Sequence, residues 1–260
     1  MKLIVNADDF GYSPGVNTGI VDAYKNGIVS STTMMANMYG FEDALKLHKE
    51  YPGLGVGAHL VLTSGKPLTN LPKEFLDDNG EFLRRPIYLD DQNESIERDW
   101  LDGELIYKEW KAQLDKILDA GFNVDHIDSH HHMHTHEQTR VAAKKISEEY
   151  KLPVRSSYLD EKYFNSPDFV KLDGDGLLSN KNTDKQKFVE LFDHITSFET
   201  VELMVHPAYV DFYLMDNSSF NTARVYEHMW LTSDYIKGLL KERNIELVTY
   251  KQFKWGDKYE

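Results

Sequence analysis

Residues 3–27, LIVNADDFGYSPGVNTGIVDAYKNG, decide the fold class because a strand signal and a helix signal follow one another there. Leu3-Ile4-Val5 is a short apolar run, which is typical of a buried strand. Ser13-Pro14 has the form of a helix N-cap followed by proline at the first helical position. Apolar residues then recur at helical spacing before Gly27, at Val16, Ile20 and Tyr24. The stretch therefore predicts a β-strand that leads directly into an α-helix.

The rest of the chain repeats this alternation. Further strands are predicted at 31–35, 54–60, 124–130, 153–157, 201–205 and 246–248. Helices are predicted at 41–49, 101–120, 137–150, 185–198 and 230–243. About seven strands that alternate with helices favour an α/β protein with a mostly parallel sheet, open or closed into a barrel. A length of 260 residues, without a Pro/Gly/Ser-rich linker or an internal repeat, predicts a single domain over residues 1–260.

The composition excludes several classes of protein. Asp and Glu number 43 against 29 Lys and Arg, so the formal net charge of −14 argues against binding to nucleic acid or to an anionic membrane. The absence of cysteine excludes disulfides, thiolate catalysis and zinc sites built on cysteine. No apolar run approaches the roughly 18 residues of a membrane span, and the start of the chain lacks a signal-peptide pattern. A cytoplasmic protein is therefore expected.

Polar residues that suit chemistry stand at the carboxyl ends of the predicted strands. In barrels and open α/β sheets the active site lies at this face, so these residues are expected to converge there. The segment 63–100 is too long for an ordinary connection and is expected near the same face. The strand-end residues are Asp8, Asp9, His59, His130, Arg155 and His206.

The stretch Asp125–His136 contains six of the 11 histidines of the chain. Alternation along a strand puts His126, Asp128 and His130 on one face. Imidazole binds Zn, Fe, Ni or Mn, and aspartate adds an oxygen ligand, so one interpretation is a metal site. The other is a solvated tract that binds metals incidentally, and the position directly after an apolar strand argues against it. Six histidines cannot all be ligands, so some would contact substrate, and Asp128 would suit the orientation of a ligand.

The remaining strand-end residues have two interpretations each. Asp8-Asp9 could give one carboxylate to a metal and one to a general base, or could form a turn that caps the next helix. His59 and His206 could be a ligand and a general acid, or structural histidines held by hydrogen bonds. Aromatic rings near these loops, such as Tyr12, could stack on a sugar or pack in the core.

Four blocks of the sequence occur in order along the chain: Asn6–Gly11 with Ser13–Asn17, Gly55–Leu60, His126–His132 and Glu202–Pro207. Together they resemble the YdjC-like carbohydrate deacetylases, the family of the chitooligosaccharide deacetylases. The resemblance implies a single-domain, TIM-like (β/α) barrel and one divalent metal ion held by an Asp-His-His set. Magnesium is the metal often given for the family, whereas a histidine-rich site suits Zn²⁺ or another transition ion better.

Carried over by position, the resemblance makes Asp9, His59 and His130 the metal ligands. It makes Asp8 the catalytic base and His206 the catalytic acid. The assignment of Asp8 and Asp9 could be exchanged, because either carboxylate can bind a metal.

The predicted function is removal of the acetyl group from an N-acetylated sugar, a short chitin-type oligosaccharide or its phosphate. The partner is then a small carbohydrate, and the residues expected to contact it are His132, Arg155 and Tyr12. Two rivals use the same site: a metal-dependent phosphoesterase or glycosidase, and a non-catalytic sugar- or metal-binding protein. Glycoside cleavage by paired carboxylates needs no histidine cluster, which favours the deacetylase. A homodimer is expected only from the general frequency of dimers.

Overall fold

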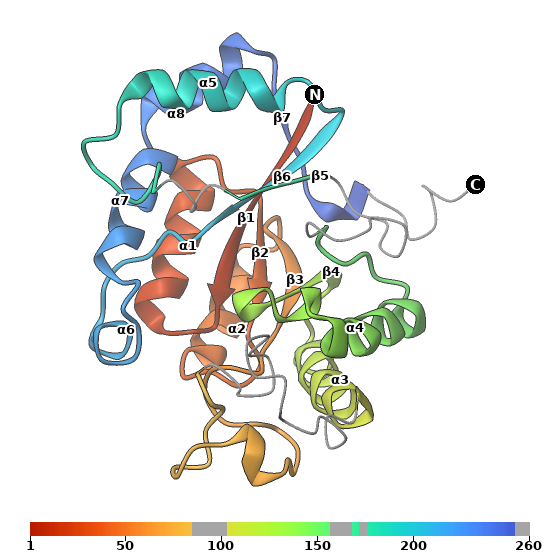
Figure 1. Cartoon of the computed structure of the whole chain (residues 1–260). Coiled ribbons are helices and arrows are strands. Elements are labelled where there is room, and N and C mark those ends of the chain that lie inside the picture. The colour runs from red at the N-terminus through yellow and green to blue at the C-terminus, as the bar shows by residue number, and fades with distance from the viewer. Residues whose placement is uncertain (85–102, 157–167, 172–175, 253–260) are drawn as a thin grey trace.

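The computed structural model describes residues 1–84, 103–156, 168–171 and 176–252 (Figure 1). Within them, the strands form one parallel sheet in the order β4-β3-β2-β1-β6-β5, and β7 pairs with the start of β1. The parallel sheet expected from the alternation is thus confirmed. The strands are β1 (Lys2–Phe10), β2 (Ser31–Met34), β3 (Gly55–Leu60), β4 (Val124–Ser129), β5 (Asp168–Lys171), β6 (Thr200–Val205) and β7 (Glu246–Leu247).

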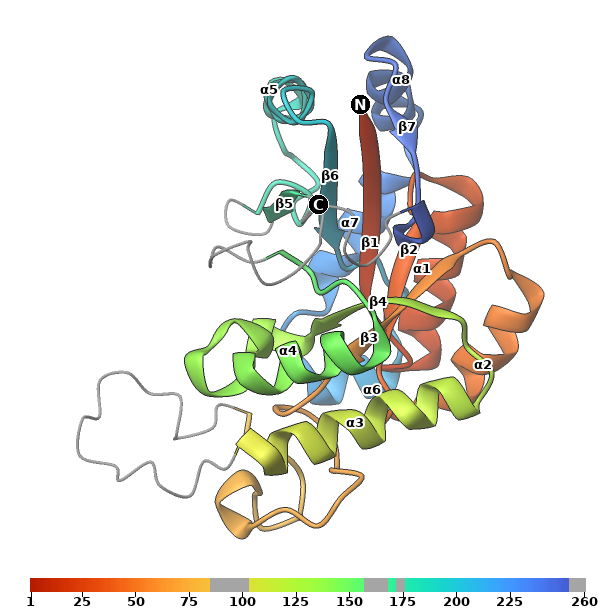
Figure 2. The same cartoon turned by 90° about the vertical axis from the view of Figure 1, so that its right-hand side faces the viewer.

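The helices follow the strands along the chain and flank the sheet. Ser13 caps α1 by accepting a hydrogen bond from Val16 N, and proline occupies the first helical position, as the sequence predicts. Figure 2 shows α3 and α4 side by side below the sheet, and α5 and α8 near the N-terminus. The helices are α1 (Pro14–Asn26), α2 (Phe41–Glu50), α3 (Gly103–Asp119), α4 (Glu137–Tyr150), α5 (Lys185–Ile195), α6 (Phe212–Asn217), α7 (Thr222–Leu231) and α8 (Asp234–Glu242).

Strand β1 is buried on both faces, and its alternate side chains pack on opposite sides of the sheet. Leu3 and Val5 belong to the large apolar cluster that includes the helices, whereas Ile4 packs with Val248 and Tyr250. The strand continues to Phe10, so the expectation that Asp8 and Asp9 follow the strand is wrong. Pairing with β6 ends at Ala7, and pairing with β2 resumes at Phe10, so the pairing with β2 carries the strand past these polar residues. Its carboxyl end therefore delivers acidic side chains to the interior.

Two other predicted elements differ from the structure. The helix predicted at 230–243 is wrong at its start, because α7 ends at Leu231 and α8 begins after Ser233. Ser233 accepts a hydrogen bond from Ile236 N, as an N-cap does, and so starts a new helix. The strand predicted at 153–157 is reduced to a single parallel bridge between Val154 and Ile127, and residue 157 lies outside the described residues.

A complete barrel would require a connection between the bridge at Val154 and β5. The residues between them, 157–167, lie outside the described part of the chain, so closure into a TIM-like barrel stays a prediction. The single domain over 1–260 likewise stays a prediction, although one cluster of buried apolar side chains runs from Leu3 to Leu240. None of the described helices combines the length and the apolar composition that a membrane span requires.

Candidate active site

The carboxyl ends of β1, β3 and β4 bring three buried side chains together. Asp9 Oδ1 lies 3.2 Å from His59 Nε2 and 3.0 Å from His130 Nδ1. The two imidazole nitrogens are 3.4 Å apart. His130 is the first residue after β4 rather than its last, in a short 3₁₀ segment, His130–Thr135. The three residues that the sequence predicts as ligands are therefore neighbours in space.

This group has the properties of a site for a cation. Asp9 Oδ1 is buried and accepts no well-formed hydrogen bond within the described residues, although two imidazole nitrogens lie close to it. A buried carboxylate oxygen without a partner is costly, and a metal ion would satisfy it. One oxygen and two nitrogens suit a divalent ion that keeps further positions for water or substrate. The residues thus fit a metal ion, without fixing which one.

Two features of the backbone and of α7 hold Asp9 in place. Successive residues of a strand point to opposite faces, yet Asp8 and Asp9 both line one cavity. The pairing register shifts between Ala7 and Phe10, and Asp9 has a φ of +74°, in the left-handed region that Asp tolerates better than most residues. Arg224 Nη2 lies 2.7 Å from Asp9 Oδ2. Burial would raise the pKa of Asp9, but Arg224, His130 and His59 together outweigh burial and hold that pKa well below the usual value.

His59 is oriented by a carboxylate on the next strand. Its Nδ1 donates to Asp128 Oδ1 at 2.7 Å, which leaves Nε2 facing Asp9. Thr33 Oγ1 donates to the other oxygen of Asp128 at 3.0 Å. Burial lowers the pKa of His59, but the carboxylates of Asp128, Asp9 and Asp8 together outweigh burial and raise that pKa to about 10. A carboxylate that fixes the far nitrogen of a histidine is the usual support of a metal ligand, which is the role that the sequence suggests for Asp128.

Asp8 is held by an arginine from beyond β4. Arg155 Nη1 donates to Asp8 Oδ2 at 2.7 Å and Nη2 donates to Oδ1 at 2.6 Å. Asn6 Nδ2 donates a third hydrogen bond to Asp8 at 2.9 Å. Burial would raise the pKa of Asp8, but the Arg155 guanidinium lowers it below the usual value. Asp8 is therefore an ionised carboxylate in a fixed orientation at neutral pH.

Arg155 itself is fully buried and does not line the cavity. Its guanidinium also lies 2.8 Å from Asp128 Oδ2 and 2.7 Å from Glu202 Oε1, and Tyr250 OH donates to the far oxygen of Glu202. Contact with a substrate stays a prediction that this location does not favour. The location favours a role in which Arg155 positions Asp8 and offsets the charges of three buried carboxylates.

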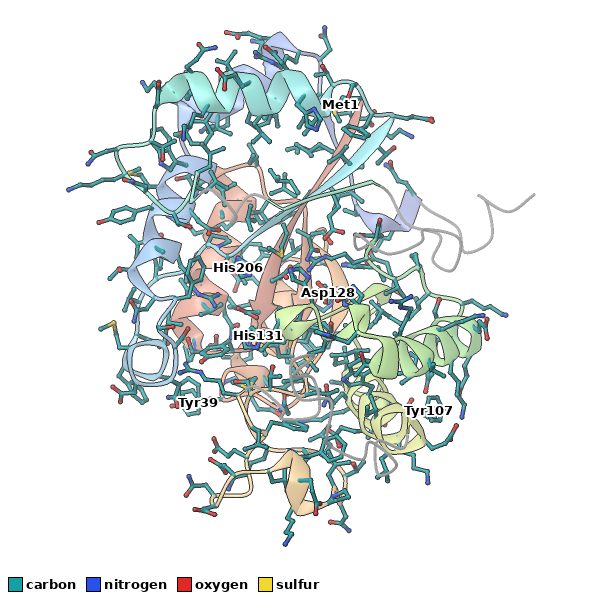
Figure 3. All side chains as sticks on the ribbon, viewed as in Figure 1. Met1, Tyr39, Tyr107, Asp128, His131 and His206 are labelled. Carbon is teal, nitrogen blue, oxygen red and sulfur yellow. The ribbon has the colours of Figure 1, made fainter. Side chains whose placement is uncertain are left out.

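The cavity beside these residues has a volume of about 420 Å³. His206 follows β6 at its wall, and its backbone N–H donates to Glu227. Tyr12 and His132 line the same cavity, and their contact with substrate stays a prediction. Figure 3 shows His206 and His131, which both line the cavity, toward the middle of the molecule. The residues that line the cavity include Asp8, Asp9, Tyr12, His59, Arg84, His130, His131, His132, His206, Asn217 and Arg224.

The histidine-rich stretch divides into residues of different function. His126 stacks on Tyr250 at 3.8 Å and packs in the interior. Burial lowers the pKa of His131 and of His134 to about 3, so both rings are neutral. His131 and His132 each have a φ of +55°, a left-handed conformation that is unusual for two successive residues other than glycine. Such backbone outliers cluster at functional sites, and this one directs two histidines at the cavity.

Sequence reasoning missed Arg224 and Glu227, which hold Asp9 and the backbone of His206. Both lie on α7, a helix that the sequence did not predict over most of its length. No local signal could have identified them, because their partners lie far away in sequence. The position of α7 in the fold would have to be known before these contacts could be predicted.

The sequence is similar to known proteins over nearly its whole length. A family model described as YdjC-like protein matches residues 2–242. Carbohydrate deacetylases from Geobacillus stearothermophilus and Brevibacillus brevis are 41% and 40% identical over 256 residues; the matches cover 96% and 97% of this chain, and 97% and 99% of those proteins.

Solved structures of other proteins are also similar to this chain. A crystal structure from Enterococcus faecalis V583, assigned only provisionally as a cellobiose-phosphate cleavage protein, has a TM-score of 0.81 and 32% identity, and the match covers 96% of this chain and 98% of that one. A lactam utilization protein from Thermus thermophilus shares the fold with a TM-score of 0.52 and 15% identity, over 95% of this chain and 99% of that one. From the family match over residues 2–242 and the relatives that span nearly the whole chain, this protein belongs to the YdjC-like family.

Proposed function

We propose that this protein is a metal-dependent carbohydrate deacetylase, which hydrolyses the amide bond of an N-acetylated sugar. The observation that carries the proposal is the buried group of Asp9, His59 and His130, with the ionised Asp8 beside it in one cavity. Two relatives at about 40% identity over nearly the full length are named carbohydrate deacetylases, which supports the reaction class. A short chitin-type oligosaccharide or its phosphate is the substrate that the sequence resemblance suggests.

The metal ion would be held by Asp9, His59 and His130. When bound, such an ion supplies a Lewis acid that polarises the amide carbonyl and acidifies a water molecule. The donor set suits Zn²⁺ or another transition ion, and the family resemblance suggests Mg²⁺.

Asp8 is proposed as the base that accepts a proton from the attacking water. Its pairing with Arg155 keeps it ionised and fixes its orientation, and a carboxylate oxygen has lone pairs beyond those that Arg155 uses. Asp9 is the less suitable base, because one of its oxygens is bound to Arg224 and the other faces two imidazoles. The geometry therefore favours Asp9 as the ligand and Asp8 as the base.

His206 is proposed as the acid that protonates the departing amine. Its backbone N–H is fixed by Glu227, its ring meets Phe220 edge-on, and Nδ1 is buried without a partner among the described residues. Histidine is the side chain that exchanges protons most readily near neutral pH. Tyr12 and His132 are proposed to contact the sugar from the cavity wall. A cytoplasmic location and a homodimer belong to the proposal as well.

The test is to incubate the purified, metal-loaded protein with N-acetylated chitooligosaccharides, aryl phosphates and aryl glycosides. Release of acetate from the first, abolished by a chelator and restored by added metal, is the expected result. Asp8→Asn is the matched variant, because it keeps the size of the side chain and removes the base. Release of phosphate or of the aryl alcohol without acetate would replace the deacetylase by one of its two rival hydrolases.

A further inference from the structure

Three aromatic side chains form a cluster on the surface, which we name the aromatic rim: Tyr39, Phe212 and Tyr213. Tyr39 lies in the loop between β2 and α2 and is 57% exposed, and Phe212, the first residue of α6, is 67% exposed. The rings of Tyr39 and Tyr213 stack at 4.8 Å with an interplanar angle of 16°. Tyr39 and Phe212 meet edge-on at 6.0 Å. These contacts fix the rings in place while much of their surface stays exposed.

The aromatic rim is continuous with the catalytic cavity. Tyr12, which lines the cavity, meets the ring of Tyr213 edge-on at 5.7 Å. Helix α6 carries two rim residues at its start and ends at Asn217, which lines the cavity. Arg84, another lining residue, donates to the carbonyl of Asn217 at 3.2 Å. Figure 3 shows Tyr39 beside α6, on the same side of the molecule as His206 and His131.

The chemistry of the aromatic rim suits a sugar better than a second protein surface. Exposed aromatic side chains in a group mark a binding surface rather than a requirement of folding. A pyranose ring offers an apolar C–H face to an aromatic ring and hydroxyls at its edge, and the phenol groups of Tyr39 and Tyr213 offer matching polar tips. The carboxylate of Glu81 acts electrostatically on Tyr213, and Asp216 is exposed on α6. Two copies placed rim to rim would bring these charges together, whereas a neutral sugar would not.

The size of the cavity is a second reason to expect a sugar at the aromatic rim. About 420 Å³ lies near the lower end of the range for small-molecule sites, roughly 300–1,000 Å³. Such a cavity suits the reacting sugar with its acetamide group, so further sugar units of a chain must leave over an edge. The aromatic rim is the exposed aromatic surface at an edge that the cavity wall reaches directly, through Tyr12.

We propose that Tyr39, Phe212 and Tyr213 form a sugar-stacking subsite, which binds a pyranose unit next to the one that is deacetylated. The subsite makes the enzyme prefer oligosaccharides to monosaccharides. This inference rests on the proposed function, because the cavity must bind the reacting sugar first.

The variant Tyr39→Ala tests the subsite. Values of kcat/KM for acetate release are measured on N-acetylglucosamine and on its β-1,4-linked dimer, trimer and tetramer. The ratio of tetramer to monomer is expected to fall about threefold to tenfold, mainly through KM, as for the loss of one aromatic stack. Tyr39→Phe keeps the stacking ring and removes only the phenol hydroxyl, so it is expected to keep most of the ratio. Met215→Ala, at a residue 50% exposed on α6 but outside the aromatic rim, is the matched control. An unchanged ratio in Tyr39→Ala would overturn the proposal.

A binding measurement separates failure of the subsite from failure of the proposed function. Calorimetry of the metal-free wild-type protein with the N-acetylated tetramer and monomer requires no turnover. Tighter binding of the tetramer that Tyr39→Ala abolishes supports the subsite, even if no acetate is released. Acetate release with equal affinity for both lengths overturns the subsite and keeps the deacetylase. A dimer in sedimentation that Tyr39→Ala converts to a monomer also overturns it, because the aromatic rim would then be a contact between copies.

Discussion

Replacing Asp128 by asparagine tests whether one buried carboxylate sets the pH dependence of metal binding. Asp128 Oδ1 accepts a hydrogen bond from His59 Nδ1 at 2.7 Å, and both side chains are buried. Burial lowers the pKa of His59, but Asp128, followed by Asp9 and Asp8, raises it from 6.5 to about 10. Without metal, His59 therefore keeps a proton at neutral pH on Nε2, the nitrogen that faces Asp9 and His130.

The expected magnitude follows from this proton. A metal ion can use His59 Nε2 only after the proton leaves, and the deprotonated fraction rises about tenfold per pH unit below the pKa. From pH 7 to pH 9 the metal affinity of the wild-type protein is therefore expected to rise about 100-fold, or about 2.7 kcal/mol. The pKa values of Asp9 and His130 are both lowered, so neither ligand adds to the slope in this range.

In Asp128→Asn the strongest influence that raises the pKa of His59 is lost. The affinity of the variant is expected to level off at a lower pH than that of the wild-type protein, and poorer orientation of the ring weakens that plateau by about 10–100-fold. Competition for Zn²⁺ with a chromophoric chelator from pH 6 to pH 9 measures both curves. Calorimetry in buffers of different ionisation enthalpy counts the protons released on binding. Urea denaturation of both proteins controls for loss of structure. A wild-type affinity that is flat above pH 7, or an equal slope in the variant, would refute the reasoning.

Three further substitutions probe the site. Arg224→Ala removes the partner of Asp9 Oδ2 and is expected to weaken metal affinity about 10–100-fold in the same competition assay; unchanged affinity would show that Asp9 needs no such support. Asp8→Asn is expected to lower kcat for acetate release by about 10²–10⁴-fold while metal affinity changes by less than tenfold, and an equal loss of both would instead make Asp8 a ligand. Arg155→Met leaves buried carboxylates unpaired and is expected to lower the free energy of unfolding in urea by about 3–5 kcal/mol; a change below about 1 kcal/mol would contradict that role.

The neighbours Asp9, His59 and His130 could be predicted because parallel strands deliver their carboxyl ends to one face. That argument needs only the order of strands and helices. It could not predict whether the side chain of Arg155 points into the interior or toward the surface, because a strand-end position is compatible with both. The buried partners Asp8, Asp128 and Glu202 decide the matter, and they lie up to 147 residues away.

The same dependence on distant residues explains why the sequence did not predict the surroundings of Arg224 and His126. The contact between Arg224 and Asp9 spans 215 residues and depends on a helix with no strong sequence signal. His126 shares a strand face with Asp128, as alternation predicts, but the ring of Tyr250 covers it. Period and spacing place a side chain on a face. Only the packing of distant segments shows whether that face meets substrate, another ring or an opposite charge.

The pairing of Asp8 and Asp9 with arginines has a consequence for synthesis of the chain. The two aspartates leave the ribosome well before their partners, because Arg155 follows 147 residues after Asp8 and Arg224 follows 215 residues after Asp9. Two ionised carboxylates cannot enter an apolar interior before their cations exist. The carboxylates of β1 must therefore stay hydrated or protonated until Arg155 and Arg224 have been translated. The charged centre can thus be completed only after α7 has been synthesised.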